Sequence, residues 1–270
     1  MAHSLAPALR AEGYVITEIV SRDSTASRRR ASRLARRVNA SAVTTATAQL
    51  SAELLWLCVP DRQIRPAAIA LAKGGKGRAR IAFHSSGTLS ARELEPLRKR
   101  GIAVASVHPL MTFVAGARPS LRGVPFAVEG DESGRRIARQ IVHDLGGESF
   151  QLPASRKAAY HAWATMTSPL LLAFLVTLEE AARIAGFTPA DARRKSLPII
   201  RQTLENYARL GPAYSFSGPI VRGDVQTVAK HAAVLRKDPV VRDAYLALAR
   251  SAMRRLPVKN REEMSRLLKN

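Results

Sequence analysis

The sequence predicts an α/β protein in which a mainly parallel sheet comes first and an all-α region follows. Strand-like and helix-like stretches alternate at short intervals up to about residue 152, which implies crossover connections between parallel strands. After Pro153 only helix-like stretches remain. Hydrophobic residues make up 46% of the 270 residues, enough for a packed core. We therefore expect two domains, at 1–152 and 153–270.

The first half begins with a helix at 4–12, which Gly13 ends. Runs rich in apolar and β-branched residues predict strands at 14–20, 42–45, 53–59, 80–83, 102–107, 125–129 and 148–152. Helices are expected between them at 24–37, 64–72, 90–101 and 133–145, and a glycine-rich loop at 73–77. Ser90 and Glu93 have the spacing of a capping box at the start of their helix.

The second half contains predicted helices at 158–185, 189–210, 224–235 and 240–256, and a polar tail that is helical or frayed. The stretch 158–178 carries no formal charge, but only 170–178 is strongly apolar, whereas a membrane-spanning helix needs about 20 apolar residues. We expect a buried core or dimer helix here and no membrane association. With no secretory signal visible, a cytoplasmic protein is expected.

Charge and cysteine content narrow the function classes. The single cysteine, Cys58, lies in an apolar run and excludes a disulfide framework or a cysteine-based zinc site. The net charge of +22 indicates either a nucleic-acid partner or simply solvated basic helix faces in a basic proteome. The basic clusters are scattered, with few aromatic residues among them for base stacking. We favour the second interpretation, with affinity for polyanions as a side effect, and expect no nucleic-acid partner.

Ligands of open parallel sheets lie beyond the carboxyl ends of the strands. Ser21 and Arg22 follow the first predicted strand, at the position that meets an adenosine ribose in dinucleotide-binding folds. An arginine there favours a 2′-phosphate, so NADP is the expected cofactor, with NAD as the alternative. The competing interpretation is that Arg22 and Asp23 only cap a loop.

Three further strand ends carry candidate residues. Val59, Pro60 and Asp61 form one turn and Ser85, Ser86 and Gly87 form another, both small enough for close approach of a ribose or nicotinamide. Ordinary turns have the same composition. His108 ends the next strand, where it either orients substrate or hydrogen-bonds its own loop.

The glycine-rich phosphate turn of a Rossmann-type unit is not visible. Such a unit needs strand, glycine turn and helix in that order, because backbone N–H groups at the helix start hold the pyrophosphate. This sequence begins inside what should be the first helix. Either the start codon lies upstream or this part of the site has been lost. We favour the first explanation, because losing that strand would remove the centre of the sheet.

Six short motifs occur in an order that resembles a known family: Leu57-Cys58-Val59-Pro60-Asp61, His84-Ser85-Ser86-Gly87, His108-Pro109-Leu110, Glu129-Gly130-Asp131, Tyr160-His161 and Ser217-Gly218-Pro219-Ile220-Val221-Arg222-Gly223-Asp224. Together they resemble bacterial Rossmann-like proteins with a C-terminal domain of unknown function, similar to the 6-phosphogluconate dehydrogenase and pyrroline-5-carboxylate reductase group. The resemblance implies a nicotinamide-binding domain and a helical domain that forms homodimers. Pro169 stands where relatives commonly carry an asparagine, which argues against a lysine–asparagine proton relay.

Lys157 and His161 are the expected catalytic residues. Their i, i+4 spacing places them on one face of the helix that opens the second domain, facing the interdomain cleft. Reduction of a carbonyl or imine needs a proton donor, which a histidine or a desolvated lysine provides near neutral pH. The competing interpretation is a core histidine beside Tyr160 and a solvated lysine.

Arg222 is the remaining candidate for substrate binding. Its guanidinium suits a carboxylate or phosphate held by two hydrogen bonds. Equally, Arg222 and Asp224 form a structural pair in which Asp224 caps the next helix.

Three hypotheses follow: an NADP-dependent oxidoreductase with a small carbonyl or imine substrate, a non-catalytic nucleotide-binding or scaffold protein, and a nucleic-acid-binding protein.

Overall fold

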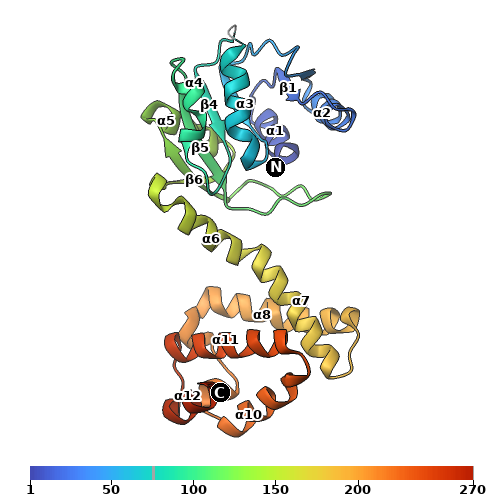
Figure 1. Cartoon of the computed structure of the whole chain (residues 1–270), viewed down its shortest axis with the longest axis vertical. Helices are drawn as coiled ribbons and strands as arrows, with labels where there is room; N and C mark the ends of the chain where they lie inside the picture. Colours follow the sequence, from blue (N-terminus) through green and yellow to red (C-terminus); the bar gives the residue numbers. More distant parts are fainter. Residues whose placement is uncertain (75–76, 270) are drawn as a thin grey trace. The chain divides into compact units, whose positions relative to one another are not determined.

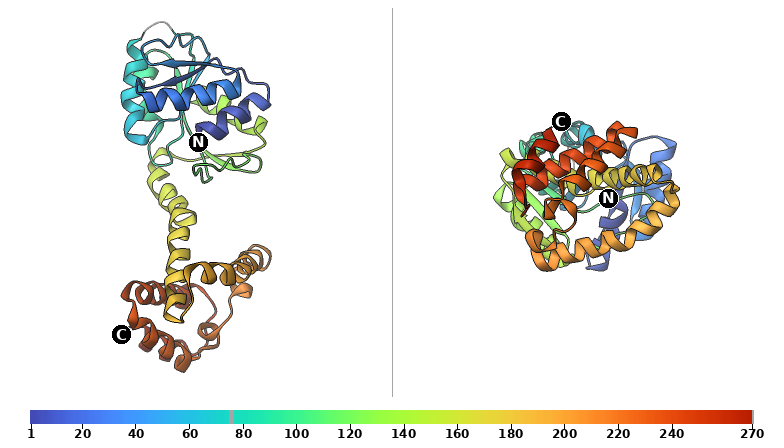
Figure 2. Two further views of the ribbon diagram at one scale, coloured as in Figure 1. Left: turned by 90° about the vertical axis from the view of Figure 1, so that its right-hand side faces the viewer. Right: turned by 90° about the horizontal axis from the view of Figure 1, so that it is seen from below.

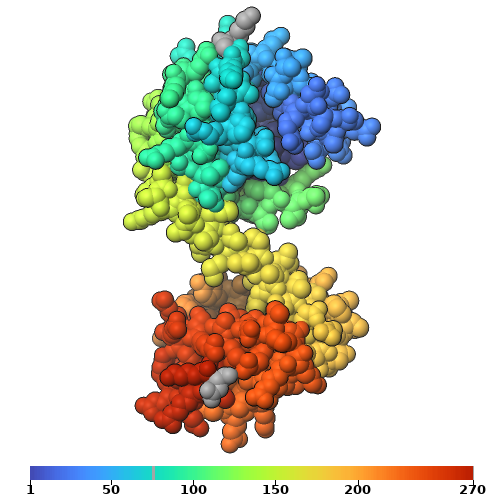
Figure 3. All heavy atoms as spheres, viewed as in Figure 1, coloured from blue at the N-terminus to red at the C-terminus, as the bar shows by residue number. Residues whose placement is uncertain are grey.

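The computed structural model describes residues 1–74 and 77–269 and divides the chain into two compact units, 1–166 and 167–270 (Figures 1 and 3). The predicted loop at 73–77 therefore lies partly outside the described residues, at Gly75 and Lys76. The last strand ends at Gln151, but the first unit includes all of helix α6 (Lys157–Thr167) except its last residue, and Lys157 and Tyr160 of this helix are buried.

The strands of the first unit form two sheets. A five-stranded sheet has the order β3-β4-β5-β6-β7, and every pairing in it is parallel except that of β5 with β6. A separate parallel ribbon consists of β1 and β2, and within the described residues no pairing joins the two sheets. The strands are β1 (Glu18–Ser21), β2 (Ser41–Thr44), β3 (Leu54–Leu57), β4 (Ile81–His84), β5 (Ala103–Pro109), β6 (Pro125–Gly130) and β7 (Glu148–Gln151). The predicted mainly parallel sheet is confirmed.

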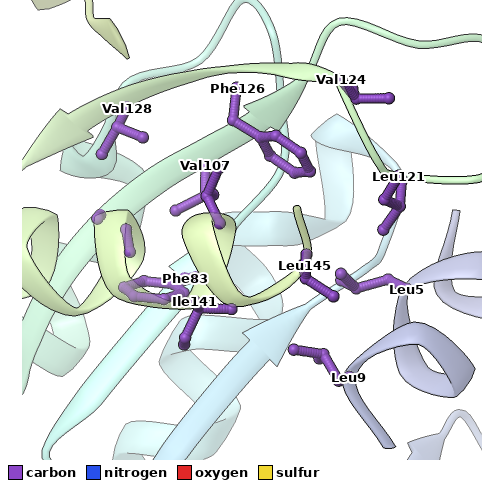
Figure 4. Close-up of a cluster of buried hydrophobic side chains, with 13 residues drawn as sticks. Leu5, Leu9, Phe83, Val107, Leu121, Val124, Phe126, Val128, Ile141 and Leu145 are labelled. Atoms are coloured by element: carbon purple, nitrogen blue, oxygen red, sulfur yellow. The ribbon is translucent and has the colours of Figure 1, made fainter. Parts of the chain in front are cut away.

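Helices cover both faces of the five-stranded sheet. On one face α3 (Asp61–Lys73) and α4 (Glu95–Arg98) bury Ile64 and Leu97 against β3, β4 and β5. On the other face α1 (Ala2–Ala11) and α5 (Glu132–Asp144) enclose the larger core, in which Phe83 and Phe126 are fully buried (Figure 4). The first unit is therefore a three-layer α/β structure, and helix α2 (Thr25–Val38) lies beside α1 and the β1–β2 ribbon (Figure 2).

The predicted capping box at Ser90 and Glu93 is wrong. The chain after Ser90 forms a 3-10 helix, η1 (Ala91–Leu94), before α4, and the Ser90 side chain caps no N–H group. Instead, the Ala91 N–H donates to Glu129 Oε2 on β6 at 2.7 Å. A carboxylate from a neighbouring strand thus performs the capping that the sequence assigned to a local pair.

The second unit consists of helices. They are α7 (Pro169–Ile184), α8 (Pro189–Ser215), α9 (Pro219–Arg222), α10 (Val225–Val234), the 3-10 helix η3 (Leu235–Lys237), α11 (Pro239–Arg255) and α12 (Arg261–Lys269). Its core brings together Val228, Leu246, Met264 and Leu268 from α10, α11 and α12. The all-α prediction for this part of the chain is confirmed.

The expected continuous helix at 158–185 is wrong in two respects. It is broken at Ser168, whose φ of −125° and ψ of −74° are not helical, because Pro169 begins a new helix. Nor is α7 a buried core helix, since it has no buried residue. By length and composition alone, Ala154–Ile184 is long and apolar enough to cross a membrane. Its most apolar 18 residues have a mean hydropathy of 1.4, and none of these residues is buried.

Candidate active site

The turn after β4 is held rigidly by the imidazole of His84. This fully buried ring approaches the Ser90 carbonyl oxygen through Nε2 at 3.0 Å, and its Nδ1 accepts from the Ser86 N–H at 3.1 Å. Both contacts are satisfied by a neutral ring that carries its proton on Nε2. Burial lowers the pKa of His84 to about 4, which keeps the ring in this form at neutral pH.

Ser86 connects the turn to the start of α3. Its hydroxyl donates to Asp61 Oδ2 at 2.7 Å and accepts from the N–H groups of Thr88 and Leu89. The predicted turns at 59–61 and 85–87 are thus brought together by one short hydrogen bond. Val59 and Pro60 lie exposed beside it at the end of β3.

Lys157 is buried beneath the same turn, with 1% of its surface exposed. Its Nζ donates to the Ser86 carbonyl oxygen at 3.1 Å and to Ser106 Oγ at 2.8 Å, while Ser106 Oγ donates to the same carbonyl oxygen at 3.1 Å. Burial lowers the pKa of Lys157 to about 8, although Glu129 and Asp61 act in the opposite direction. The interpretation of Lys157 as a solvated charge is therefore wrong.

His108 lies at the end of β5 and is linked to α6 by a hydrogen bond. Its Nδ1 is 2.8 Å from Tyr160 Oη, and the two rings meet edge to face with centroids 5.5 Å apart. Burial, reinforced by the nearby Lys157 ammonium, lowers the pKa of His108 to about 4. Burial also raises the pKa of Tyr160 to about 12. At neutral pH this is a pair between a neutral imidazole and a protonated phenol.

His161 completes the cluster on the same helix. Its ring centroid is 6.1 Å from that of His108, and both imidazoles lie against Gly87. A methyl group on Gly87 would overlap His161 Cδ2 and come within 2.9 Å of His108 Nε2. An alanine at this position would therefore force the two rings to move, because they occupy the space that its methyl group would fill. The structure thus brings together three segments that the sequence singled out separately.

Ser21 and Arg22 lie elsewhere in the first unit, at the end of β1. Asp23 pairs with Arg28 at 3.4 Å and the Arg22 carbonyl oxygen accepts from the Ser24 N–H at 2.9 Å, while the cap of α2 is the Ser24 side chain, which accepts the Ser27 N–H. The Arg22 side chain is exposed and makes no ion pair among the described residues. Its guanidinium is therefore available to an anion.

Arg222 lies in the second unit, exposed at the end of α9. Asp224 accepts the Thr227 N–H at 3.0 Å and caps α10, which confirms its predicted structural role. This hydrogen bond also lowers the pKa of Asp224. No ion pair between Arg222 and Asp224 occurs among the residues that the structure describes, so the cap does not depend on Arg222.

Several residues of the cluster were not identified from the sequence. Tyr160 was noted as part of a motif and as a core neighbour of His161 but was given no role, and Ser106 was not considered although it is a fully buried polar residue of β5. Trp56 on β3 donates from Nε1 to Ser85 Oγ at 2.8 Å. Among residues 1–74 and 77–269 no group of acidic, histidine or cysteine side chains is arranged to hold a metal ion.

The residues present fit part of a nicotinamide dinucleotide. The exposed Arg22 guanidinium suits an anionic end of such a ligand, and the Gly87 turn follows β4 at the carboxyl edge of the sheet, where these folds bind ligands.

Comparison with known proteins agrees with this fold. Residues 1–109 match the Rossmann-like domain family, and residues 124–252 match the domain of unknown function DUF2520. The resemblance inferred from the six motifs is thereby confirmed for both parts of the chain. No curated protein matches the sequence.

Solved structures share the fold over almost the whole chain. A provisionally assigned NADP oxidoreductase from Bacteroides fragilis has 21% identity and a TM-score of 0.75, covering 92% of both chains. A protein from Thermotoga maritima has 27% identity and a TM-score of 0.71, covering 93% of this chain and 95% of its own. A pyrroline-5-carboxylate reductase from Coxiella burnetii has 12% identity and a TM-score of 0.58, covering 93% and 94%.

Proposed function

The chain combines a Rossmann-like domain with a DUF2520 domain, and from this premise we propose that it is an NAD(P)-dependent oxidoreductase acting on a small carbonyl or imine substrate. One observation carries the proposal. At the carboxyl ends of parallel strands, where such folds bind their ligands, His108 and His161 converge on the backbone of Gly87. The similarity to proteins described as an NADP oxidoreductase and a reductase supports it.

In the proposed reaction the bound cofactor supplies or accepts a hydride. Protonation of the reduced substrate is assigned to His161, because it is the half-buried imidazole next to Gly87. We assign Lys157, the other expected donor, a positioning role. Its Nζ donates to the Ser86 carbonyl oxygen and to Ser106 Oγ, and the first of these hydrogen bonds positions the turn that contains Gly87.

The proposal is tested by titrating the full chain with NADPH and NADH, followed by turnover assays on a panel of small ketones, aldehydes and imines. We expect cofactor binding and turnover that His161→Ala abolishes. The exposed His143→Ala is the control and should keep full activity. If neither cofactor binds at millimolar concentration, the proposal fails. Binding without turnover would favour the non-catalytic nucleotide-binding hypothesis.

NADP is the proposed cofactor because the Arg22 guanidinium is exposed after β1 and forms no ion pair with any residue that the structure describes. Removing a charge-assisted contact to the 2′-phosphate costs about 1.5–3 kcal/mol, or about 10- to 100-fold in affinity. Arg22→Ala should therefore weaken NADPH binding by that factor and leave NADH binding unchanged, as measured by fluorescence titration. The control is Arg254→Ala, an exposed arginine of the second unit. Equal losses for both cofactors would exclude this role of Arg22.

A cytoplasmic homodimer is the proposed assembly, formed through the helical unit. The contacting helices α7 and α8 expose large apolar side chains, including Leu172 at 63% and Tyr207 at 60%. Monomers rarely expose so much apolar surface, and a second copy would present the same surface to cover it. We therefore propose that a second copy of this chain, and not a membrane, covers the exposed apolar side chains of α7 and α8.

Sedimentation equilibrium tests the dimer. The wild type should be dimeric at micromolar concentration, and Leu172→Glu should shift the dissociation constant at least 100-fold because it places a charge in the apolar contact. Val240→Glu alters a somewhat more exposed apolar residue on α11 and should leave the dimer intact. A monomeric wild type, or a dimer that tolerates Leu172→Glu, would contradict the proposal.

A further inference from the structure

We propose that Tyr160 fixes His108 in the tautomer with its proton on Nε2, so that His108 presents a neutral N–H donor at Gly87 to the carbonyl oxygen of a substrate. Tyr160 is then a positioning residue and His108 a substrate-contacting one. The inference rests on the function proposed above and makes it more specific, because it selects substrates whose reacting group accepts a hydrogen bond.

The direction of the hydrogen bond follows from satisfying both side chains. Tyr160 is almost fully buried, and among the described residues its hydroxyl contacts no other hydrogen-bond partner than His108 Nδ1, at 2.8 Å. If Nδ1 carried the proton, the phenol hydrogen would be left buried and unpaired, which costs about 1–3 kcal/mol. Donation from Tyr160 Oη to Nδ1 satisfies both groups and places the imidazole proton on Nε2.

The other ring nitrogen of His108, Nε2, lies beside the Gly87 backbone. Within the described part of the chain, His108 Nε2 has no hydrogen-bond partner, and it lies next to the Gly87 backbone, where a methyl group would come within 2.9 Å of it. Lys157, His161 and Asp61 are the charged or titratable groups that act on His108 most strongly, and the nearby Lys157 opposes a second positive charge. The site therefore offers a neutral donor, which a carbonyl oxygen accepts and a cationic iminium group does not.

A similar pair in the second unit provides a matched control. His231 Nδ1 lies 3.1 Å from Tyr245 Oη, with the rings edge to face and their centroids 5.9 Å apart. This pair joins α10 to α11 and takes no part in the cluster at Gly87. Tyr245→Phe removes the same hydroxyl from the same kind of contact, so it separates a general effect of losing a phenol from one specific to His108.

Nitrogen-15 NMR of the histidine rings tests the tautomer directly, without a substrate. In the wild type we expect His108 to show a protonated Nε2 and an unprotonated Nδ1 from pH 6 to 8. Tyr160→Phe should give a mixture of tautomers at His108, whereas Tyr245→Phe should change only His231. Thermal unfolding of both variants verifies that they fold. A protonated Nδ1 in the wild type, or a His108 spectrum unaffected by Tyr160→Phe, would overturn the inference.

Kinetics tests the role of the tautomer. With a ketone that the wild type reduces, Tyr160→Phe should lower kcat/KM about 10-fold, the loss expected from one weakened hydrogen bond to the reacting oxygen. Tyr245→Phe should not change it. Unchanged kcat/KM in Tyr160→Phe would overturn the substrate-contacting role of His108. If cofactor binds but no ketone reacts, the proposed function fails while the NMR result still decides the tautomer.

Discussion

Replacing Gly130 with alanine is expected to destabilise the first unit by about 3 kcal/mol or more. Gly130 ends β6 with a φ of +138°, a conformation that L side chains rarely adopt. A methyl group there would overlap the Val104 carbonyl oxygen and lie 2.6 Å from Ala105 Cα, and backbone atoms of the adjacent strand cannot move aside. Backbone strain and steric overlap therefore both destabilise the folded state of Gly130→Ala.

Gly101→Ala is the matched control, because Gly101 also has a positive φ, of +79°, but no atom within 4 Å of an added methyl group. It should cost only about 1 kcal/mol, the conformational part of the effect. Urea unfolding followed by tryptophan fluorescence measures both, since Trp56 and Trp163 lie in the first unit. If both variants lose the same free energy of unfolding, the backbone of β5 must move to accommodate the added methyl group of Gly130→Ala.

Lys157→Met is expected to abolish a large pH dependence of stability. Burial lowers the pKa of Lys157 from 10.5 to about 8, so the folded protein binds this proton less tightly than the unfolded chain. The wild type should therefore gain stability as the pH rises from about 8 to 10.5, by up to about 3 kcal/mol. Well below pH 8, where Lys157 is protonated in both states, the buried charge opposes folding at full strength.

The measurement is the difference in free energy of unfolding between wild type and Lys157→Met across pH 7–11. Taking this difference cancels the opposing effect of buried tyrosines, such as Tyr160. Lys99→Met removes an exposed lysine of the same unit and should follow the wild-type curve. Parallel curves for wild type and Lys157→Met would mean that Lys157 keeps its ordinary proton affinity when folded.

Part of the candidate site was predictable from local sequence. Gly87 and His108 follow predicted parallel strands, and the carboxyl ends of neighbouring parallel strands meet at one edge. Placing these two residues together needs only the strand order. The pairing of His108 with Tyr160 spans 52 residues and depends on how α6 packs on the sheet, which no local pattern specifies.

The errors have a common cause in long-range packing. A lysine at a helix start is typically solvated, and only the packing of α6 on the sheet encloses Lys157. Glu129, far along the sequence, replaces the expected local cap at Ser90. The break at Ser168 differs from these errors because it has a local signal. Pro169 is typical of the first turn of a new helix, but the prediction of one continuous helix rested on the apolar pattern across this position.

The division of the first unit into two sheets has an energetic consequence. A two-stranded ribbon is marginally stable by itself, so β1 and β2 depend on α2 and belong to a separate, weaker cooperative unit than β4 and β5. The turn at Gly87 is held by the buried contacts of His84, Ser86 and Lys157. Under the proposed function we therefore expect substitutions in the ribbon to change the affinity for the cofactor and to leave the geometry at Gly87 intact.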